Sequence, residues 1–170
     1  NKLTVAGDIT VTSTGPSIFL TDTDSNPDYQ IKNGNGTLRI IDTTNSTDRL
    51  NIDSSGSLLI GKTEDGTGNA GHVFFGNGAA YHIRDGGFTN FFNRLSSNGE
   101  ILRFAKDGTT KGRIGTDGSD IYVGSDDTNI LFHADGVLPA NSVGGVRDNA
   151  FDLGSSSARF QDLFLSGGVY

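Results

Sequence analysis

The sequence predicts an all-β fold, and three observations support that prediction. The 170 residues include 25 glycines and only 3 prolines, so turns must be frequent. Five Asp-Gly pairs and four Asn-Gly pairs are spread along the chain, and such pairs tolerate the positive φ angles of two-residue hairpin turns. Before residue 153, no segment keeps a helical spacing of apolar residues over three turns.

Short segments with one apolar side account for the expected strands. Each segment is three to six residues long and alternates apolar with polar side chains, which places the apolar side chains on one face. The stretches 38–60 and 120–140 both follow the order strand, polar turn, strand, turn, strand, which suggests one module used twice. In chain order, the alternating pairs are Leu3/Val5, Ile9/Val11, Tyr29/Ile31, Leu38/Ile40, Leu50/Ile52, Tyr81/Ile83, Leu102/Phe104, Ile121/Val123 and Ile130/Phe132.

The composition raises the question of how these strands bury their apolar faces. Hydrophobic residues make up 34% of the chain, which is modest for a globular protein. A closed monomeric sandwich is one solution, but it usually has longer strands and more apolar side chains. In the other solution, identical chains pack around a common axis and each contributes one apolar face to a shared core. We expect the second arrangement.

Charge and residue usage exclude several classes of function. The net charge is −7, from 20 acidic and 13 basic residues, so nucleic-acid binding is not expected. No apolar run is long enough for a membrane span, so we expect no membrane insertion. Cysteine is absent, which rules out disulfides and thiolate metal sites. Methionine is also absent, and we therefore expect the chain to be an internal part of a longer protein.

One acidic stretch, 21–28, spaces its oxygen ligands like the start of a calcium-binding loop. Pro27 replaces the turn glycine of such a loop, and Asn33 replaces its closing glutamate. A solvated loop is therefore the main interpretation, with calcium as the alternative, and we expect no cofactor. Four residues occupy the first ligand positions: Asp22, Asp24, Asn26 and Asp28.

The segment DLGSSSARFQDLFLSGG (152–168) contains a serine cluster, 155–157. GSSS is not the G-x-S-x-G nucleophile elbow, and neither His nor Lys lies near it in sequence, so we expect no catalysis there. A serine at Ser155 or Ser156 is instead suited to cap a helical turn. Phe160, Leu163 and Phe164 would share one face of that turn. Alternation through Leu163 and Leu165 favours a strand, so we expect a single helical turn leading into a strand.

Two further polar groups are weaker candidates. Asp117, Asp120 and the stretch SDDTN (125–129) contain the carboxylates that a glycosidase pairs, but sequence does not fix their separation. The three histidines, His72, His82 and His133, lack a metal-ligand spacing. Each is expected to be a partly exposed strand residue, with an ion on a three-fold axis as the alternative.

The densest aromatic group lies between residues 74 and 92. Exposed aromatic rings beside Asp and Asn are typical of sugar-binding surfaces, and these six residues are candidates for glycan contact. Core packing is the main alternative for them. The group consists of Phe74, Phe75, Tyr81, Phe88, Phe91 and Phe92.

LGSSSARFQDLFLSGGVY (153–170) resembles a segment repeated across tail-fibre and tailspike proteins of tailed bacteriophages. The likeness rests on Leu-Gly-Ser-Ser, then an arginine and an aromatic residue, then an apolar run ending in Ser-Gly-Gly. The stretches 16–44, 49–61, 101–116 and 148–160 resemble other parts of these fibres, whereas 62–100 does not. In many such proteins this segment precedes an endosialidase-type intramolecular chaperone, of which this chain contains no recognisable copy.

The resemblance implies an elongated, intertwined homotrimeric β fibre with a shaft of the triple β-helix or β-prism kind and small β-sandwich-like modules. We expect soft boundaries near 61–71 and 139–150, which are rich in small and turn-forming residues. The expected segments are shaft repeats (1–61), an aromatic-rich β module (62–100), shaft or hairpin repeats (101–150), and a C-terminal joint with the helical turn and strand (151–170).

The expected function is that of a structural, non-enzymatic virion protein. The chain would belong to a phage tail fibre that acts outside the host cell and holds or presents the host-receptor-binding region for adsorption. Its expected partners are its own copies, other tail or baseplate proteins, and a host cell-surface glycan or protein receptor. The alternatives are a tailspike segment that degrades or binds host polysaccharide, a calcium-dependent carbohydrate-binding module, and an adhesin stalk.

Overall fold

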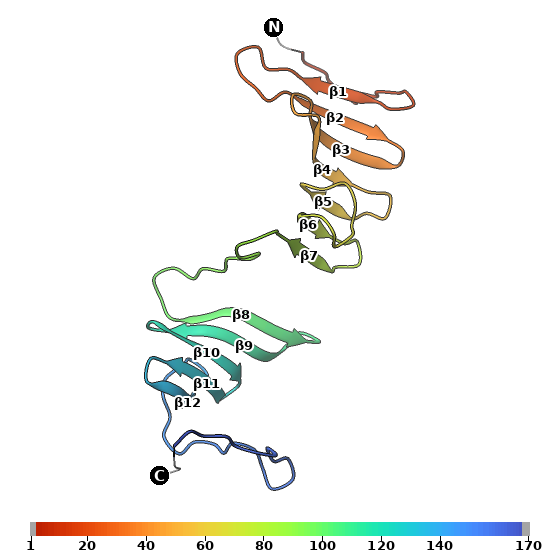
Figure 1. The fold of residues 1–170 in the computed structure, drawn as a ribbon. Helices are drawn as coiled ribbons and strands as arrows, with labels where there is room; N and C mark the ends of the chain where they lie inside the picture. The colour runs from red at the N-terminus through yellow and green to blue at the C-terminus, as the bar shows by residue number, and fades with distance from the viewer. Residues whose placement is uncertain (1–2, 168–170) are drawn as a thin grey trace. The chain divides into compact units, whose positions relative to one another are not determined.

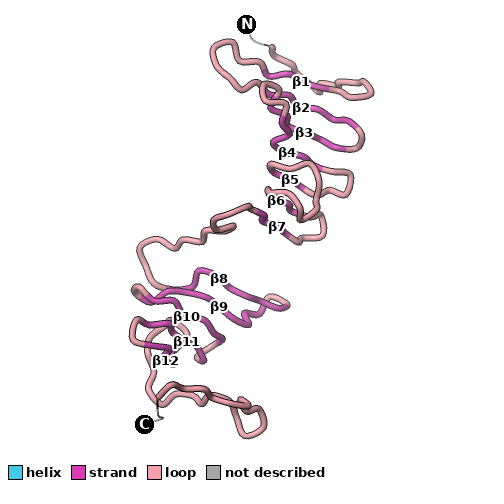
Figure 2. The backbone as a smooth tube through the Cα atoms, in the orientation of Figure 1, coloured by secondary structure: helices cyan, strands magenta, loops and turns pink. Residues whose placement is uncertain are grey.

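The structure is a computed structural model that describes residues 3–167, and it is all-β, as the sequence predicts. Within that range it contains twelve strands and no helix (Figure 2). All strand pairs are antiparallel, and they form two separate sheets. The chain divides into two compact units between Phe91 and Phe92, with one sheet in each unit. None of the described residues forms a helix that is long and apolar enough to span a membrane.

The first unit contains a seven-stranded meander in which each strand pairs with the next along the chain (Figure 1). Such an order needs only short connections, and turn residues supply them. The strands are β1 (Ser17–Leu20), β2 (Tyr29–Gly34), β3 (Thr37–Asp42), β4 (Thr47–Ile52), β5 (Leu58–Ile60), β6 (Gly71–Phe74) and β7 (Ala80–Ile83).

The second unit contains a five-stranded meander that also follows chain order. The expected order of strands and turns is confirmed in both stretches, because β3–β5 (37–60) and β10–β12 (120–140) are both three-stranded meanders. The strands are β8 (Gly99–Lys106), β9 (Thr109–Asp117), β10 (Asp120–Ser125), β11 (Thr128–His133) and β12 (Gly136–Ala140).

Two of the Asn-Gly and Asp-Gly pairs form the tight hairpin turns that the sequence predicts. Asn35 and Gly36 join β2 to β3 with φ angles of 54° and 76°. Asp107 and Gly108 join β8 to β9 with φ angles of 52° and 73°. Both central residues of each turn therefore lie in the left-handed region, the conformation that matches the twist of a two-stranded hairpin.

The two ends of the described chain differ from the expectation. Residues 3–16 form no strand, because their backbone pairs with no neighbouring strand. The side chains of Leu3/Val5 and Ile9/Val11 remain exposed, although Ile9 and Val11 line a pocket beside Ile18 and Ile31. Residues 151–167 form neither the expected helical turn nor the strand. An isolated helical turn is costly to nucleate. Of the side chains expected on its apolar side, Phe160 and Phe164 remain exposed, whereas Leu163 lines a pocket with Ile130 and Val137 of the second sheet. Residues 168–170 of the predicted joint lie outside the described residues.

The first sheet runs through the region where a boundary is expected. Strands β5 and β6 flank residues 61–70, and they pair directly through Leu59 and Val73. The intervening loop is therefore a connection within one sheet, and residues 71–83 belong to the same sheet as residues 17–60.

The first sheet exposes its apolar side and buries its more polar side, the reverse of an ordinary surface sheet. One row of side chains crosses six strands in register and ends at His72 of β6. Leu38, Ile52, Leu58 and Phe74 form a second row on the same side, and we call this side the first apolar face. Most of its large side chains remain solvent-exposed, for example Ile18 at 48% and Ile60 at 39%, and Ile40, Leu50 and Leu58 are half-buried. The first row consists of Ile18, Ile31, Ile40, Leu50, Ile60 and His72.

The opposite side of the first sheet carries polar residues and is covered by the chain itself. Arg39, Asn51, Leu59 and Val73 follow one another in register across it. Three of these four, Asn51, Leu59 and Val73, have at most 2% of their surface exposed. Among the described residues of this unit, most of the buried side chains therefore lie on this side or in the loop 61–70, and Asp42 is also buried at the end of β3.

The second sheet repeats this inversion. Tyr122 and Leu131 are buried on one side, where Gly144 lies against the Tyr122 ring. On the other side, two rows of apolar residues cross the strands in register and stay largely exposed. We call this side the second apolar face: Leu102, Ile114, Val123, Ile130, Pro139, Ile121, Phe132 and Val137.

Candidate functional site

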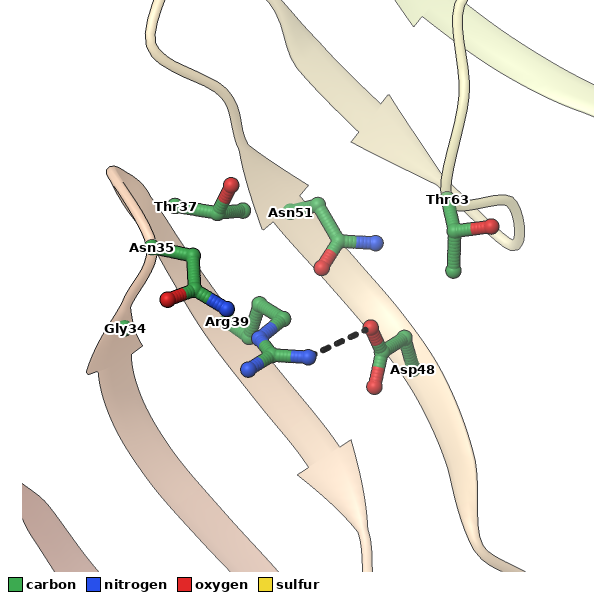
Figure 3. Close-up of a pocket in the computed structure, with 7 residues that line it drawn as sticks. All are labelled: Gly34, Asn35, Thr37, Arg39, Asp48, Asn51 and Thr63. Atoms are coloured by element: carbon green, nitrogen blue, oxygen red, sulfur yellow. Dashed lines mark ion pairs between the residues drawn. The ribbon is translucent and has the colours of Figure 1, made fainter. Parts of the chain in front are cut away.

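A polar pocket lies on the covered side of the first sheet, opposite the first apolar face. Its volume is about 180 Å³. Figure 3 shows the Arg39 guanidinium beside the Asp48 carboxylate, with the Asn51 amide next to them. We call it the Arg39 pocket, and it is lined by Gly34, Asn35, Thr37, Arg39, Asp48, Asn51 and Thr63.

A β-bulge places Asp48 in this pocket. Ile40 pairs with Leu50, but Ile41 pairs with Asp48, so one extra residue is inserted in β4. Without the bulge, Asp48 would share the face of Leu50, because side chains alternate along a strand. The bulge instead places Asp48 on the side of Arg39, 3.7 Å from its Nη1 atom. Bulges commonly redirect one side chain in this way next to functional sites.

The loop 61–70 fixes the other side of the pocket. The Asn51 side-chain amide donates a hydrogen bond to the Lys62 carbonyl at 2.8 Å. The Lys62 ammonium in turn donates to the carbonyls of Gly66 and Asn69, at 2.5 and 3.3 Å. Lys62 is 6% exposed, so its charge is held by backbone oxygens rather than by water. Thr63, which follows Lys62 in this loop, lines the pocket (Figure 3).

Two buried polar atoms in the pocket form no hydrogen bond. Among residues 3–167, Arg39 Nε and Asn51 Oδ1 find no hydrogen-bond partner. One is a donor and the other an acceptor, and their residues pair across β3 and β4. The pocket can therefore accept and donate hydrogen bonds at neighbouring points. It contains a single carboxylate, whereas glycoside hydrolysis uses two.

In the acidic loop 21–28, for which calcium binding is the alternative interpretation, Asp22 and Asp28 accept hydrogen bonds from backbone amides of the same loop. Asp28 accepts a hydrogen bond from the Asp22 amide at 2.8 Å, and Asp22 accepts one from the Asp24 amide at 3.2 Å. Asn26 Oδ1 accepts one from the Thr44 hydroxyl. Within residues 3–167, no three His, Cys, Asp or Glu side chains are grouped so that they hold a metal ion. The structure therefore provides no calcium geometry at this loop.

The six aromatic candidates do not come together as one surface. Phe74 lies on the first apolar face, and Phe75 packs edge-on against Tyr81 with ring centroids 4.7 Å apart. Phe88 and Phe91 lie in the segment after β7, with centroids 5.8 Å apart. Phe92 belongs to the second unit. None of the six is buried in the single chain, so core packing within the chain does not explain them either.

The structure brings two of the three histidines together. His72 and His82 pair across β6 and β7, and their Nδ1 atoms lie 2.7 Å apart. His133 lies elsewhere, 3.8 Å from an Asp120 oxygen and 3.5 Å from an Asp135 oxygen. The sequence did not reveal the histidine pair, because residues ten apart meet only when the hairpin register is known.

The remaining acidic and serine candidates have structural partners. Asp117 accepts a hydrogen bond from the Asn98 side chain at 2.8 Å, and Asp127 accepts one from the Ser142 amide at 3.4 Å. Ser155 and Ala158 form two hydrogen bonds, one from the Ala158 amide to the Ser155 hydroxyl and one from the Ser155 amide to the Ala158 carbonyl. Ser155 thus closes a tight turn rather than capping the expected helical turn.

No protein-family model, curated protein or solved structure matches the chain.

Proposed function

We propose that the chain is a structural, non-enzymatic part of a tailed-bacteriophage tail fibre, in which three copies associate through their apolar faces. In the virion, outside the host cell, it would hold or present the receptor-binding region of the fibre. Other tail or baseplate proteins and a host-surface glycan or protein receptor would be its partners. The observation that carries the proposal is the inverted burial of both sheets.

Each sheet exposes the residues that a soluble single chain would bury. The buried apolar residues among 3–167 are only Leu59, Val73, Tyr122, Leu131 and Ala140. Contiguous apolar patches of this kind mark interaction surfaces. Covering the exposed half of one Leu or Ile side chain is worth about 1 kcal/mol. The two faces, repeated in every copy, therefore supply the cohesion that a single chain lacks.

Identical copies are the partner that fits these faces best. The first apolar face carries no Lys, Arg or Glu in its two rows, so it offers a partner shape and apolar area rather than charge. The opposite side carries the Arg39 pocket, so the apolar faces can meet without covering that pocket. The trimeric state and the tail-fibre setting come from the likeness of 153–170 and its companion stretches to phage fibres.

The oligomeric state of the purified chain tests the proposal. Sedimentation equilibrium should give the mass of a trimer. Ile60→Asp removes a residue of the first apolar face, and Tyr81→Asp removes one of similar exposure, 39% against 43%, from the opposite side. We expect Ile60→Asp to dissociate the trimer and Tyr81→Asp to leave it intact. A monomeric parent chain, or equal behaviour of the two variants, would contradict the proposal.

The fibre setting needs a test of its own. Antibodies raised against the purified chain should label the tails of particles made by the virus or lysogen that encodes it, and their Fab fragments should block adsorption. Labelling of uninfected cell surfaces instead would favour an adhesin stalk.

A second candidate is a tailspike segment that binds or degrades host polysaccharide, and the Arg39 pocket is the observation that favours it. Incubation of the chain with host capsule and measurement of released reducing ends separates the two candidates. Sustained release would establish an enzyme, whereas the proposed fibre segment should release none.

A further inference from the structure

We propose that the Arg39 pocket binds one neutral sugar ring. The inference deepens the proposed function, on which it rests only for the claim that the pocket stays open in a trimer. It does not concern the six aromatic residues, which the structure does not bring together.

The charges of the pocket exclude a charged ligand. Arg39 and Asp48 are its only charged lining residues, and they lie 3.7 Å apart. An anion would compete with Asp48 for Arg39, and a cation would compete with Arg39 for Asp48. In either case one half-buried charge would lose its partner, which disfavours a charged ligand. The ligand that leaves this pair intact is neutral.

The two unpartnered atoms select a ligand rich in hydroxyl groups. Arg39 Nε is a donor and Asn51 Oδ1 an acceptor, and both are buried. An apolar ligand would leave both unsatisfied. A hydroxyl group both accepts and donates, so neighbouring hydroxyls on a ring can satisfy the two atoms together. Asp48, Thr37 and Thr63 offer further hydroxyl partners around them.

The pocket has room for a sugar ring. Its volume of about 180 Å³ is well above the roughly 10–15 Å³ that one water molecule needs on the same measure. The pocket is open to solvent on one side. A longer glycan would therefore place one of its residues in the pocket and leave the others outside.

The pocket faces away from the surface that we propose to be covered in the trimer. Arg39 and Asn51 alternate along their strands with Ile40, Leu50 and Ile52 of the first apolar face. Association through that face leaves the pocket accessible, and a trimer would present three copies. Repeated weak sites bind a polymeric glycan more tightly than a single sugar.

The test is a titration of the whole isotope-labelled chain, followed by amide chemical shifts. The probes are glucose, galactose, mannose and N-acetylglucosamine as neutral rings, glycerol as a small polyol, and N-acetylneuraminic acid as a charged ring. Small neutral ligands of this kind bind with dissociation constants in the millimolar range. We expect saturable shifts at Arg39, Asp48, Asn51 and Thr63 with at least one neutral ring.

Matched variants assign the shifts to the pocket. Asp48→Asn should weaken binding at least tenfold, and Thr37→Val several-fold, with the fold checked by circular dichroism. Asp85→Asn makes the same chemical change on an exposed loop of the same unit and should leave binding unchanged. Equal weakening by Asp48→Asn and Asp85→Asn would overturn the assignment.

The probes also decide the ligand class and its source. Three results would overturn the proposal. No neutral ring gives saturable shifts, glycerol binds as tightly as the rings, or N-acetylneuraminic acid binds more tightly than the rings. The first result would leave water as the occupant of the pocket. Tighter binding of a polymer of the best sugar, measured on the same sample, points to a glycan rather than a free sugar. Because sedimentation reports the trimer separately, loss of sugar binding in a trimeric chain refutes the pocket alone.

Discussion

Arg49 donates two hydrogen bonds to the buried carboxylate of Asp42, from Nε at 3.2 Å and from Nη2 at 2.5 Å. Arg49 is the extra residue of the bulge that also directs Asp48 into the Arg39 pocket. Asn45 adds hydrogen bonds from its backbone and side-chain amides. Asp42 therefore joins the end of β3, the following turn and the bulged part of β4.

These hydrogen bonds predict a loss of stability in acid. The Arg49 guanidinium, followed by Asn45, lowers the pKa of Asp42 from 3.8 to about 2, although burial opposes the shift. A carboxyl group whose pKa is lower in the folded state stabilises the fold at pH values above its unfolded pKa. This contribution should be complete above about pH 5 and should disappear as the pH falls through 3.8 towards 2.

Chemical denaturation of the parent chain and of Asp42→Asn between pH 2 and pH 7 measures this contribution. The parent should be more stable than the variant at pH 7, and the difference should shrink towards pH 2. Asp85→Asn, on an exposed loop, should follow the parent at every pH. A difference between parent and Asp42→Asn that does not change with pH would contradict the assigned role of the carboxylate.

We expect any side chain at residue 115 to destabilise the fold, because the Tyr122 ring lies directly over Gly115. A Cβ atom at residue 115 would lie 2.5 Å from the Tyr122 ring and 2.6 Å from the Gly99 carbonyl oxygen. Tyr122 is fully buried under the loop 141–147 and has no room to move. Gly115→Ala should therefore lower the free energy of unfolding by about 1–3 kcal/mol.

Gly68→Ala is the matched control in urea unfolding, because a Cβ atom at residue 68 has no atom within 4 Å. Its unfolding free energy should stay within about 0.5 kcal/mol of the parent value. Equal midpoints for Gly115→Ala and Gly68→Ala would show that the Tyr122 ring moves away from the sheet.

The sequence predicts the strands well wherever alternation and turn chemistry coincide. Leu38/Ile40 and Leu50/Ile52 alternate and are joined by turn-forming residues, and they lie in β3 and β4. Ile9/Val11 alternate equally well but form no strand, because alternation does not provide a neighbouring strand to pair with. Strand β9 has few alternating apolar residues, because Gly112 and Gly115 stand where the rings of Phe104 and Tyr122 pack. Alternation therefore does not predict this strand.

The pocket could not be predicted from the sequence, because a bulge creates it. Arg39, Asp48 and Asn51 form no motif, and regular alternation would place Asp48 with Leu50 on the opposite face. The candidates chosen by motif, such as the acidic loop 21–28, instead form hydrogen bonds within their own loop. The buried position of Asn51 depends on the loop 61–70 folding over it, a contact between residues eleven positions apart.

If three copies share the second apolar face, Phe132 should contribute more to stability than its position in one chain suggests. Its ring is 50% exposed in the single chain. Burial in a trimer would make Phe132→Ser cost about 2 kcal/mol per chain. The melting temperature of the parent should also rise with protein concentration, because association stabilises the folded state.

Val143→Ser is the control for this measurement, since Val143 is 61% exposed and lies outside the strands. It should leave the melting temperature unchanged. Circular dichroism melts of both variants over a hundredfold range of concentration provide the comparison. A parent melting temperature independent of concentration, with no effect of Phe132→Ser, would mean that the second apolar face stays open to water.

The histidine pair on the first apolar face predicts the tautomers of all three histidines. The Nδ1 atoms of His72 and His82 lie 2.7 Å apart, so one of them must carry a proton and the other must accept the hydrogen bond. Two imidazolium ions at this distance would repel each other, and a buried trimer interface would strengthen that repulsion. His133 is the internal reference, because its Nδ1 accepts a hydrogen bond from the Asp135 amide at 3.1 Å.

Long-range proton–nitrogen spectra, recorded with the histidine side chains uncharged, distinguish the two tautomers directly. We expect one ring of the His72–His82 pair to carry its proton on Nδ1, and the other ring and His133 to carry it on Nε2. His82→Phe keeps a ring beside Phe74, whose centroid lies 5.7 Å from that of His82, but removes the hydrogen bond. The Nδ1–H signal should then disappear or move, while the His133 signals stay in place. Three Nε2–H tautomers in the parent chain would mean that the two rings do not share a proton, and β6 and β7 would then be held together by their backbone hydrogen bonds and by packing alone.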